Sequence, residues 1–168
     1  EDIPFLPIEF FKSHILLEEG RNAEVIFESS GTTGTTPSRH HVADTGLYRE
    51  SFLRSFYSFY GSPEELCILA LLPSYMERMT SSLVYMMDHL IGWSKHSESG
   101  FYLENLDELS TLLGKRNEDK HPTLLVGVSF ALFDLAEKHA LQLGDHITLM
   151  ETGGMKGRRK ELVRSELH

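Results

Sequence analysis

Residues 123–152 read TLLVGVSFALFDLAEKHALQLGDHITLMET, which is an apolar run, an amphipathic run and a second apolar run in succession. The almost continuously apolar TLLVGV is typical of a strand that is buried on both faces. FALFDLAEKHALQL, residues 130–143, predicts an amphipathic helix, and HITLME, residues 146–151, predicts another strand. A strand, a helix and a strand in this order form the unit from which parallel sheets are built. This stretch therefore indicates an α/β fold.

The same alternation extends towards the amino terminus. Further strands are predicted at 23–28, 39–42, 66–72 and 100–104, and further helices at 45–60, 80–93 and 105–116. Asp44, Asn105 and a residue between Thr80 and Ser82 are expected to cap helices, and Gly61 to end one. Tyr48, Phe52, Phe56 and Phe59 are spaced as one helix face. We expect the strands near 23–28, 66–72, 123–127 and 147–151 to share one sheet, giving a three-layer α/β fold with a mostly parallel sheet flanked by helices.

Composition limits the classes of protein to consider. The chain has 168 residues, which suits one domain or a substantial piece of a larger one, and its formal net charge is −9. That charge argues against a general binder of nucleic acid or anionic membranes. No apolar run reaches the roughly 18 residues that a membrane span requires. The single cysteine, Cys67, lies in an apolar run, so we expect a buried, unreactive thiol and a cytoplasmic protein.

Three polar segments that contain glycine follow predicted strands: SSGTTGTTPS at 29–38, GVS at 127–129 and ETGGMKG at 151–157. In parallel sheets, ligands bind at the carboxyl ends of strands. The first segment is neither a Walker loop nor a dinucleotide fingerprint. Its glycines and hydroxyls have the chemistry of an anion cradle, but a serine- and threonine-rich surface turn has the same composition.

Ser29-Ser30-Gly31-Thr32-Thr33-Gly34 with Pro37 resembles the phosphate loop of the adenylate-forming superfamily, in which the pattern is small-Ser-Gly-Thr-Thr-Gly-x-Pro-Lys. The proline is one residue late, and Ser38-Arg39 stands where that lysine is expected. ITLMETGGMKGRRKEL, residues 147–162, resembles the segment of that superfamily that borders the adenine and the acyl group, and 123–137 resembles the strand and helix beside the acyl pocket. Together with LPSYMERMTSSLVYMMDHLI, residues 72–91, these segments are most similar to the acyl-protein synthetases of bacterial bioluminescence.

The resemblance implies an AMP-forming ligase that uses ATP and Mg²⁺ to activate a long-chain fatty acid as an acyl-adenylate. Its acceptor would be a protein thiol, coenzyme A or a carrier-protein thiol, and a fatty acyl reductase is a possible acyl-accepting partner. The implied nucleotide-binding residues are Ser29, Ser30, Gly31, Thr32, Thr33, Gly34, Thr35, Thr36, Arg39, Thr152, Gly153, Gly154, Met155 and Lys156. The implied acyl pocket comprises Tyr75, Ser82, Met86, Val128 and Ser129, although ordinary core packing is the favoured role for the methionine.

The catalytic lysine and glutamate of the superfamily have no counterpart here. We therefore expect residues 1–168 to be part of the large N-terminal adenylating domain, with the C-terminal half of the enzyme absent from this chain and these residues inactive alone.

Two other readings compete with an acyl-protein ligase. The first is an acyl- or aryl-CoA ligase of the same superfamily. The second is a serine hydrolase that uses Ser129, because Gly127-Val-Ser129-Phe-Ala131 approximates the nucleophile elbow and Asp145-His146 follows. No metal site is predicted, because the adjacent His40 and His41 point to opposite faces of a strand.

Overall fold

The computed structural model describes residues 5–29, 36–73 and 78–153. The helices are α1 (Phe10–Ser13), α2 (Thr45–Tyr60), α3 (Ser82–Trp93), α4 (Leu106–Asp119) and α5 (Ser129–Lys138), with a short 3-10 helix at Pro63–Glu65. The strands are β1 (Val25–Glu28), β2 (Arg39–Val42), β3 (Cys67–Leu71), β4 (Gly100–Phe101), β5 (Thr123–Val128) and β6 (Ile147–Thr152).

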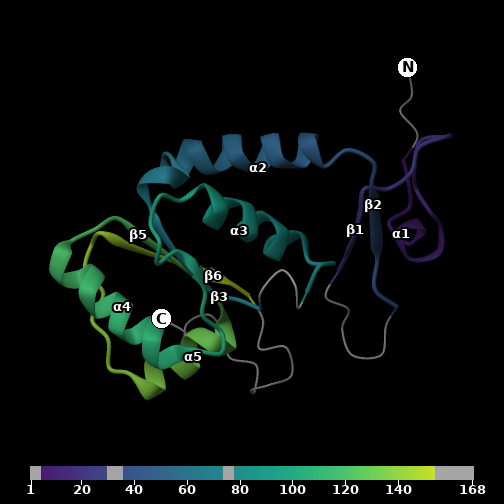
Figure 1. Ribbon diagram of the computed structural model, residues 1–168. Helices are drawn as coiled ribbons and strands as arrows, with labels where there is room; N and C mark the ends of the chain where they lie inside the picture. The colour runs from purple at the N-terminus through teal and green to yellow at the C-terminus, as the bar shows by residue number, and fades with distance from the viewer. Residues whose placement is uncertain (1–4, 30–35, 74–77, 154–168) are drawn as a thin grey trace.

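A parallel sheet of four strands, in the order β4-β3-β5-β6, organises the fold. Its register aligns Cys67 of β3 with Thr123 of β5, and Thr123 with Ile147 of β6. Helices α2 and α3 lie on one face of the sheet, and α4 and α5 lie on the other (Figure 1). The chain is thus an α/β protein with a parallel sheet flanked by helices, as the sequence predicted.

The two central strands form the core. Every residue of β3 and β5 is buried, and Leu69 and Leu125 are almost completely inaccessible. Two-sided burial explains why these segments are continuously apolar. The edge strand β6 is different, because Leu149 is half exposed there while Ile147 is buried.

The prediction that residues 23–28 join this sheet is wrong. Strand β1 pairs only with β2, in an antiparallel hairpin that aligns Val25 with Val42 and Glu28 with Arg39. Within β1 only Phe27 is buried, and Ile26 is 38% exposed. The apolar run of three residues is too short for a strand covered on both faces, and the nearby β2 supplies its hydrogen bonds.

Most helix ends agree with the sequence signals. The Asp44 carboxylate accepts a hydrogen bond from the Gly46 amide at 2.8 Å, and the Ser81 hydroxyl accepts one from the Val84 amide at 3.3 Å. Gly61 ends α2 with φ of 77°, a left-handed value that favours glycine. Asn105 precedes α4 but makes no capping hydrogen bond.

Two other predicted element boundaries differ from those in the structure. The helix predicted at 130–143 ends at Lys138, and the strand predicted at 100–104 is limited to Gly100–Phe101. Phe52 and Phe56 are buried, but Phe59 is 82% exposed because the buried stripe of α2 continues in steps of four to Tyr60.

Cys67 is fully buried at the start of β3, as expected. Burial raises the pKa of its thiol. The thiolate, which is the nucleophilic form, is therefore disfavoured.

A carboxylate outside the sheet fastens the hairpin to α2. Both the amide and the hydroxyl of Thr45 donate to Glu24 Oε2, at 2.9 and 2.7 Å. The backbone hydrogen bond from Thr45 is the main cause that lowers the pKa of Glu24 below its ordinary value of 4.5. A carboxylate with a lowered pKa stabilises the fold at pH values above its unfolded-state pKa, and this contribution disappears as the pH falls through the folded-state pKa.

Replacing Glu24 by glutamine is expected to lower the free energy of unfolding at neutral pH. The difference from wild type should shrink as the pH falls below 4.5, where protonation weakens the same interaction in the wild type. Urea denaturation across a pH series measures this difference in the free energy of unfolding. Glu18→Gln, which removes the exposed ion pair between Glu18 and Arg21, is the control. A difference that is independent of pH would contradict the role given to the carboxylate.

Candidate functional site

The base of the loop that resembles a phosphate loop is a closed hairpin end. The Ser29 amide donates to the Ser38 carbonyl at 3.0 Å, and the Ser38 amide donates to the Ser29 hydroxyl at 2.9 Å. One position earlier, Arg39 Nε donates to Glu28 Oε1 at 3.0 Å. These contacts hold the two ends of the segment 29–38 together.

Aromatic packing fixes this hairpin against the helices. The ring of Phe27 contacts the rings of Tyr48 on α2 and Tyr85 on α3, each with a centroid distance of 5.4 Å. The Glu28 amide donates to the Thr80 carbonyl at 2.8 Å, and the Tyr48 hydroxyl donates to the Ser82 carbonyl at 3.1 Å. The end of β1 is therefore held beside the start of α3.

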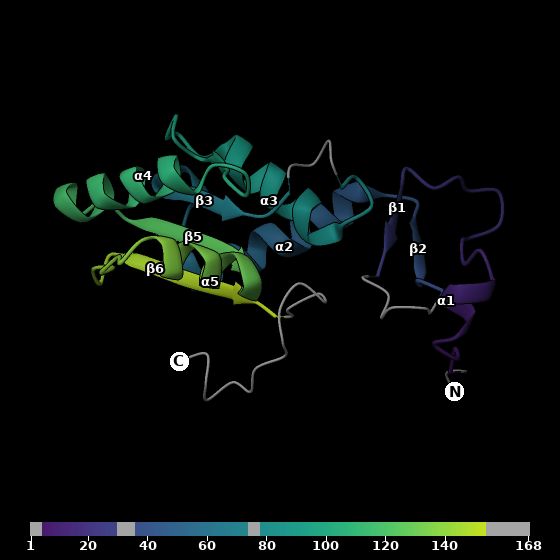
Figure 2. The ribbon, with the colours of Figure 1, turned by 90° about the horizontal axis from the view of Figure 1, so that it is seen from below.

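Strands β3, β5 and β6 all point towards the side of the molecule on which the hairpin lies (Figure 2). Their carboxyl ends carry the other two polar segments. The structure thus places Ser29, the Val128–Ser129 junction and Thr152–Gly153 on the same side of the fold.

The ends of β5 and β6 are joined by side-chain hydrogen bonds. The hydroxyl of Ser129, at the start of α5, donates to Glu151 Oε1. The Thr152 hydroxyl donates to the Gly127 carbonyl at 3.4 Å. At Gly153 no atom of the described chain lies within 4 Å of where a Cβ would stand. A flat group could therefore approach the backbone of Gly153 closely.

The glycine of GVS has a packing role. A Cβ on Gly127 would lie 2.8 Å from Leu132 Cγ and 3.0 Å from Leu71 Cβ. Both distances are shorter than normal carbon contacts, so glycine lets α5 pack directly on β5. This contact sets the position of Ser129.

The predicted site residues fall into three groups. Ser29, Thr36 and Arg39 flank the hairpin loop, and Thr152 and Gly153 end β6. In the predicted acyl pocket, Ser82 is exposed at the start of α3, Met86 packs against the core, and Val128 and Ser129 are buried. Ten predicted residues lie outside the described part of the chain: Ser30, Gly31, Thr32, Thr33, Gly34, Thr35, Tyr75, Gly154, Met155 and Lys156.

Arg39, one of the implied nucleotide-binding residues, forms an ion pair in the structure. It is paired with Glu28, and both side chains are partly exposed, at 62% and 30%. Such a surface pair contributes little to stability, so Arg39 can exchange Glu28 for a phosphate at small cost. Glu28 and Glu151, the partners of Arg39 and Ser129, were not predicted. Both partners follow from the strand register of the β1–β2 hairpin and of β6, which the sequence alone does not give.

The structure does not bring Ser129 together with Asp145 and His146, the acid and histidine that the sequence suggested for a serine hydrolase. Asp145 and His146 precede β6, whereas Ser129 follows β5, which runs parallel to β6. Five residue steps of strand, about 16 Å, separate the two ends of the sheet. The Ser129 hydroxyl bonds to Glu151 rather than to a histidine.

Replacing Ser129 by alanine is expected to leave hydrolysis of p-nitrophenyl esters at the level of the unmodified protein. Stability should fall by about 0.5–1.5 kcal/mol, because a hydrogen bond is lost and Glu151 can turn to water. Denaturation and ester hydrolysis are measured together, with Ser58→Ala on the exposed face of α2 as the control. Loss of ester hydrolysis in a folded Ser129→Ala protein would contradict this interpretation.

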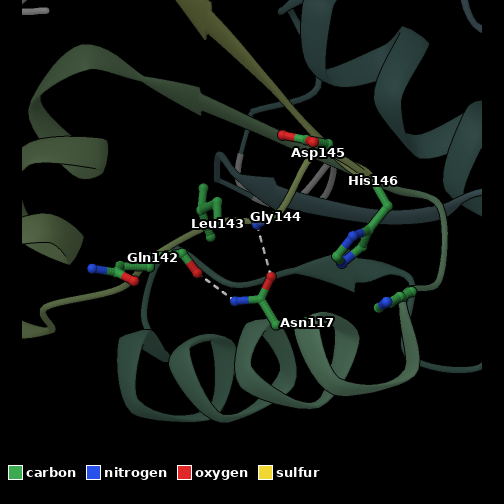
Figure 3. A pocket seen from close by; sticks show the side chains of 7 residues that line it. Asn117, Gln142, Leu143, Gly144, Asp145 and His146 are labelled. Carbon is green, nitrogen blue, oxygen red and sulfur yellow. Dashed lines mark hydrogen bonds between the residues drawn. The ribbon is translucent and has the colours of Figure 1, made fainter.

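A pocket among the described residues is formed partly by Asp145 and His146, which precede β6, so it lies at the opposite end of the sheet (Figure 3). It has a volume of about 710 Å³ and is lined by Asn117, Lys120, Gln142, Leu143, Gly144, Asp145 and His146. Asn117 accepts a hydrogen bond from the Gly144 amide at 2.9 Å and donates to the Gln142 carbonyl. Its side-chain amide is therefore occupied in tying α4 to the segment before β6. None of the predicted nucleotide-binding or acyl-pocket residues lines this pocket.

No protein-family model matches this sequence, and no curated protein or solved structure matches the chain. None of the helices in the described ranges combines the length and the apolar character that crossing a membrane requires.

Proposed function

We propose that this chain forms part of the large N-terminal domain of a cytoplasmic, AMP-forming ligase that activates a long-chain fatty acid as an acyl-adenylate. One observation carries the proposal. The hairpin end that bears the adenylate-type sequence and the Thr152–Gly153 end of β6 lie on the same side of the fold, at the carboxyl ends of the parallel strands (Figure 2). Ligand sites of open α/β sheets occupy this position.

The reaction needs positioning and charge stabilisation more than covalent catalysis. An oxygen of the fatty-acid carboxylate attacks the α-phosphorus of ATP, and the bond from that phosphorus to the pyrophosphate oxygen breaks. Loop 29–36 would hold the β- and γ-phosphates through backbone amides and hydroxyls. Arg39, at the base of the loop, would add a positive charge.

The backbone at Gly153 would fit a flat adenine ring, because no atom of the described residues beyond its chain neighbours lies within 4 Å of where a Cβ would stand. Mg²⁺ would be held mainly by phosphate oxygens and water, which is its usual environment beside a nucleotide. It would share the phosphate charge. No side chain of this chain is assigned to it.

The acyl chain would pass between the start of α3 and the β5–α5 junction, where Ser82, Met86, Val128 and Ser129 lie. The acceptor would be a thiol: that of a protein, of coenzyme A or of a carrier protein. A fatty acyl reductase that receives the acyl group is the partner implied by the resemblance. An acyl- or aryl-CoA ligase is the second candidate, because the same loop and the same strand ends would bind ATP and the acid in that enzyme too.

Exchange of labelled pyrophosphate into ATP, measured on the full-length protein, tests the proposal. Exchange should depend on added fatty acid and should be greater with a long-chain acid than with acetate or benzoate. Exchange that is supported best by an aryl acid would favour the second candidate. No acid-dependent exchange with any of these acids would overturn the proposal.

A further inference from the structure

Two histidines that are distant in sequence meet at the end of the sheet opposite the proposed adenylation site. His96 lies between α3 and β4, and His121 lies between α4 and β5. Their Nε2 atoms are 3.0 Å apart, and their ring centroids are 4.2 Å apart. Both residues are half buried.

The backbone holds both histidines in place. The His121 amide donates to Asp119 Oδ1 at 3.1 Å and to the Arg116 carbonyl at 3.3 Å. The His96 amide donates to the Ser94 hydroxyl at 3.2 Å, and that hydroxyl donates to the Leu66 carbonyl at 2.7 Å. The rings are therefore pre-positioned by elements that belong to the core.

The facing Nε2 atoms suit a bound cation as well as a shared proton. Zinc bonds imidazole nitrogen at about 2.0–2.1 Å, so two ligands at a tetrahedral angle stand about 3.3 Å apart. The Nε2 atoms, 3.0 Å apart, would therefore separate by about 0.3 Å, and the rings, with centroids 4.2 Å apart, would also turn so that both lone pairs point at the ion. Metal binding requires neutral imidazoles, and burial, with smaller effects of His96 and Arg116, lowers the pKa of His121.

We propose that His96 and His121 form an open, two-histidine site for a divalent transition-metal ion of the zinc class. The described residues contain no group of three or more His, Cys, Asp or Glu that could hold a metal ion, so in this proposal the two imidazoles are the ligands from the described part of the chain, and water would complete the coordination. Imidazole suits zinc, copper and nickel better than magnesium or calcium. The site is independent of the proposed adenylation.

Calorimetric titration of untagged, full-length protein with ZnCl₂ at neutral pH tests the proposal. One ion per chain should bind, and His96→Gln and His121→Gln should each abolish that binding. His146→Gln is the matched control, because His146 lies near the same end of the sheet but outside the pair, and it should bind zinc as the wild type does. MgCl₂ should give no saturable signal.

A second measurement needs no variant and so does not depend on the folding of one. One equivalent of zinc should protect His96 and His121, and not the other histidines, from modification by diethylpyrocarbonate, as located by peptide mass spectrometry. Unchanged modification of both residues, or undiminished zinc binding in folded His96→Gln and His121→Gln proteins, would overturn the proposal.

Discussion

Replacement of both loop glycines, Gly31 and Gly34, by valine is expected to lower acid-dependent ATP–pyrophosphate exchange of the full-length protein by at least about tenfold. Both residues lie outside the described ranges, so the prediction rests on their sequence and on the closed hairpin base at Ser29 and Ser38. Valine disfavours the backbone conformations that bring successive amides to one anion. Each lost hydrogen bond to a charged phosphate is worth about 1.5–3 kcal/mol.

Strands β1 and β2, which flank the loop, form a hairpin separate from the four-stranded sheet, so the melting temperature should change little. Gly92→Val with Gly114→Val is the matched control, because it adds the same two side chains at helical positions where, apart from the helix's own backbone, no atom of the described residues lies within 4 Å of a new Cβ. Unchanged exchange in a folded loop variant would show that the segment 29–36 is a surface turn.

Replacing Gly127 by alanine is expected to destabilise the fold by about 1–3 kcal/mol, because the new methyl group overpacks the contact between β5 and α5. The methyl would meet Leu132 Cγ at 2.8 Å and Leu71 Cβ at 3.0 Å. The Leu71 contact is the harder to relieve, since its Cβ is fixed to the central strand β3. Chemical denaturation measures the change.

Gly114→Ala in α4 provides the comparison for the same added methyl group. Apart from the backbone of α4 itself, no atom in the described ranges lies within 4 Å of where a Cβ on Gly114 would stand, so alanine should stabilise the helix by roughly 0.5–1 kcal/mol. A Gly127→Ala protein as stable as the Gly114→Ala protein would contradict the close approach of α5 to β5.

The parallel sheet could be predicted because its strands are buried on both faces. Residues 66–72 and 123–127 are continuously apolar, and the structure buries every residue of β3 and β5. The amphipathic segments between them supply the covering helices. Asp44, Ser81 and Gly61 mark helix ends through local hydrogen bonds and backbone conformation, which depend little on distant parts of the chain.

Residues 23–28 were misplaced because a short apolar run does not specify its partner. The antiparallel pairing of β1 with β2 depends on the loop that brings Arg39 opposite Glu28, and on the aromatic contacts of Phe27. The strand pairing and the aromatic contacts arise from three-dimensional packing, which cannot be predicted from hydrophobic periodicity.

The sequence indicated the location of the candidate site, but not its side-chain partners. The three polar segments could be assigned to strand ends from their order alone. The pairs Ser129–Glu151 and Arg39–Glu28 depend on strand register, and His96–His121 depends on the sheet order that places β4 and β5 on either side of β3. In the sequence, a histidine precedes each of β4 and β5, but only the order of the strands in the sheet shows that the two histidines lie close together.

The fate of carboxylate oxygen tests the central claim of acid adenylation most directly. The full-length protein would be incubated with ATP, Mg²⁺, a thiol acceptor and a long-chain fatty acid labelled with ¹⁸O in both carboxylate oxygens. If a carboxylate oxygen attacks the α-phosphorus, transfer of the acyl group leaves that oxygen on the released AMP, so mass spectrometry should find one ¹⁸O atom in AMP and none in pyrophosphate. Recovery of ¹⁸O in inorganic phosphate together with ADP, or thioester formation with no label in AMP, would contradict the account.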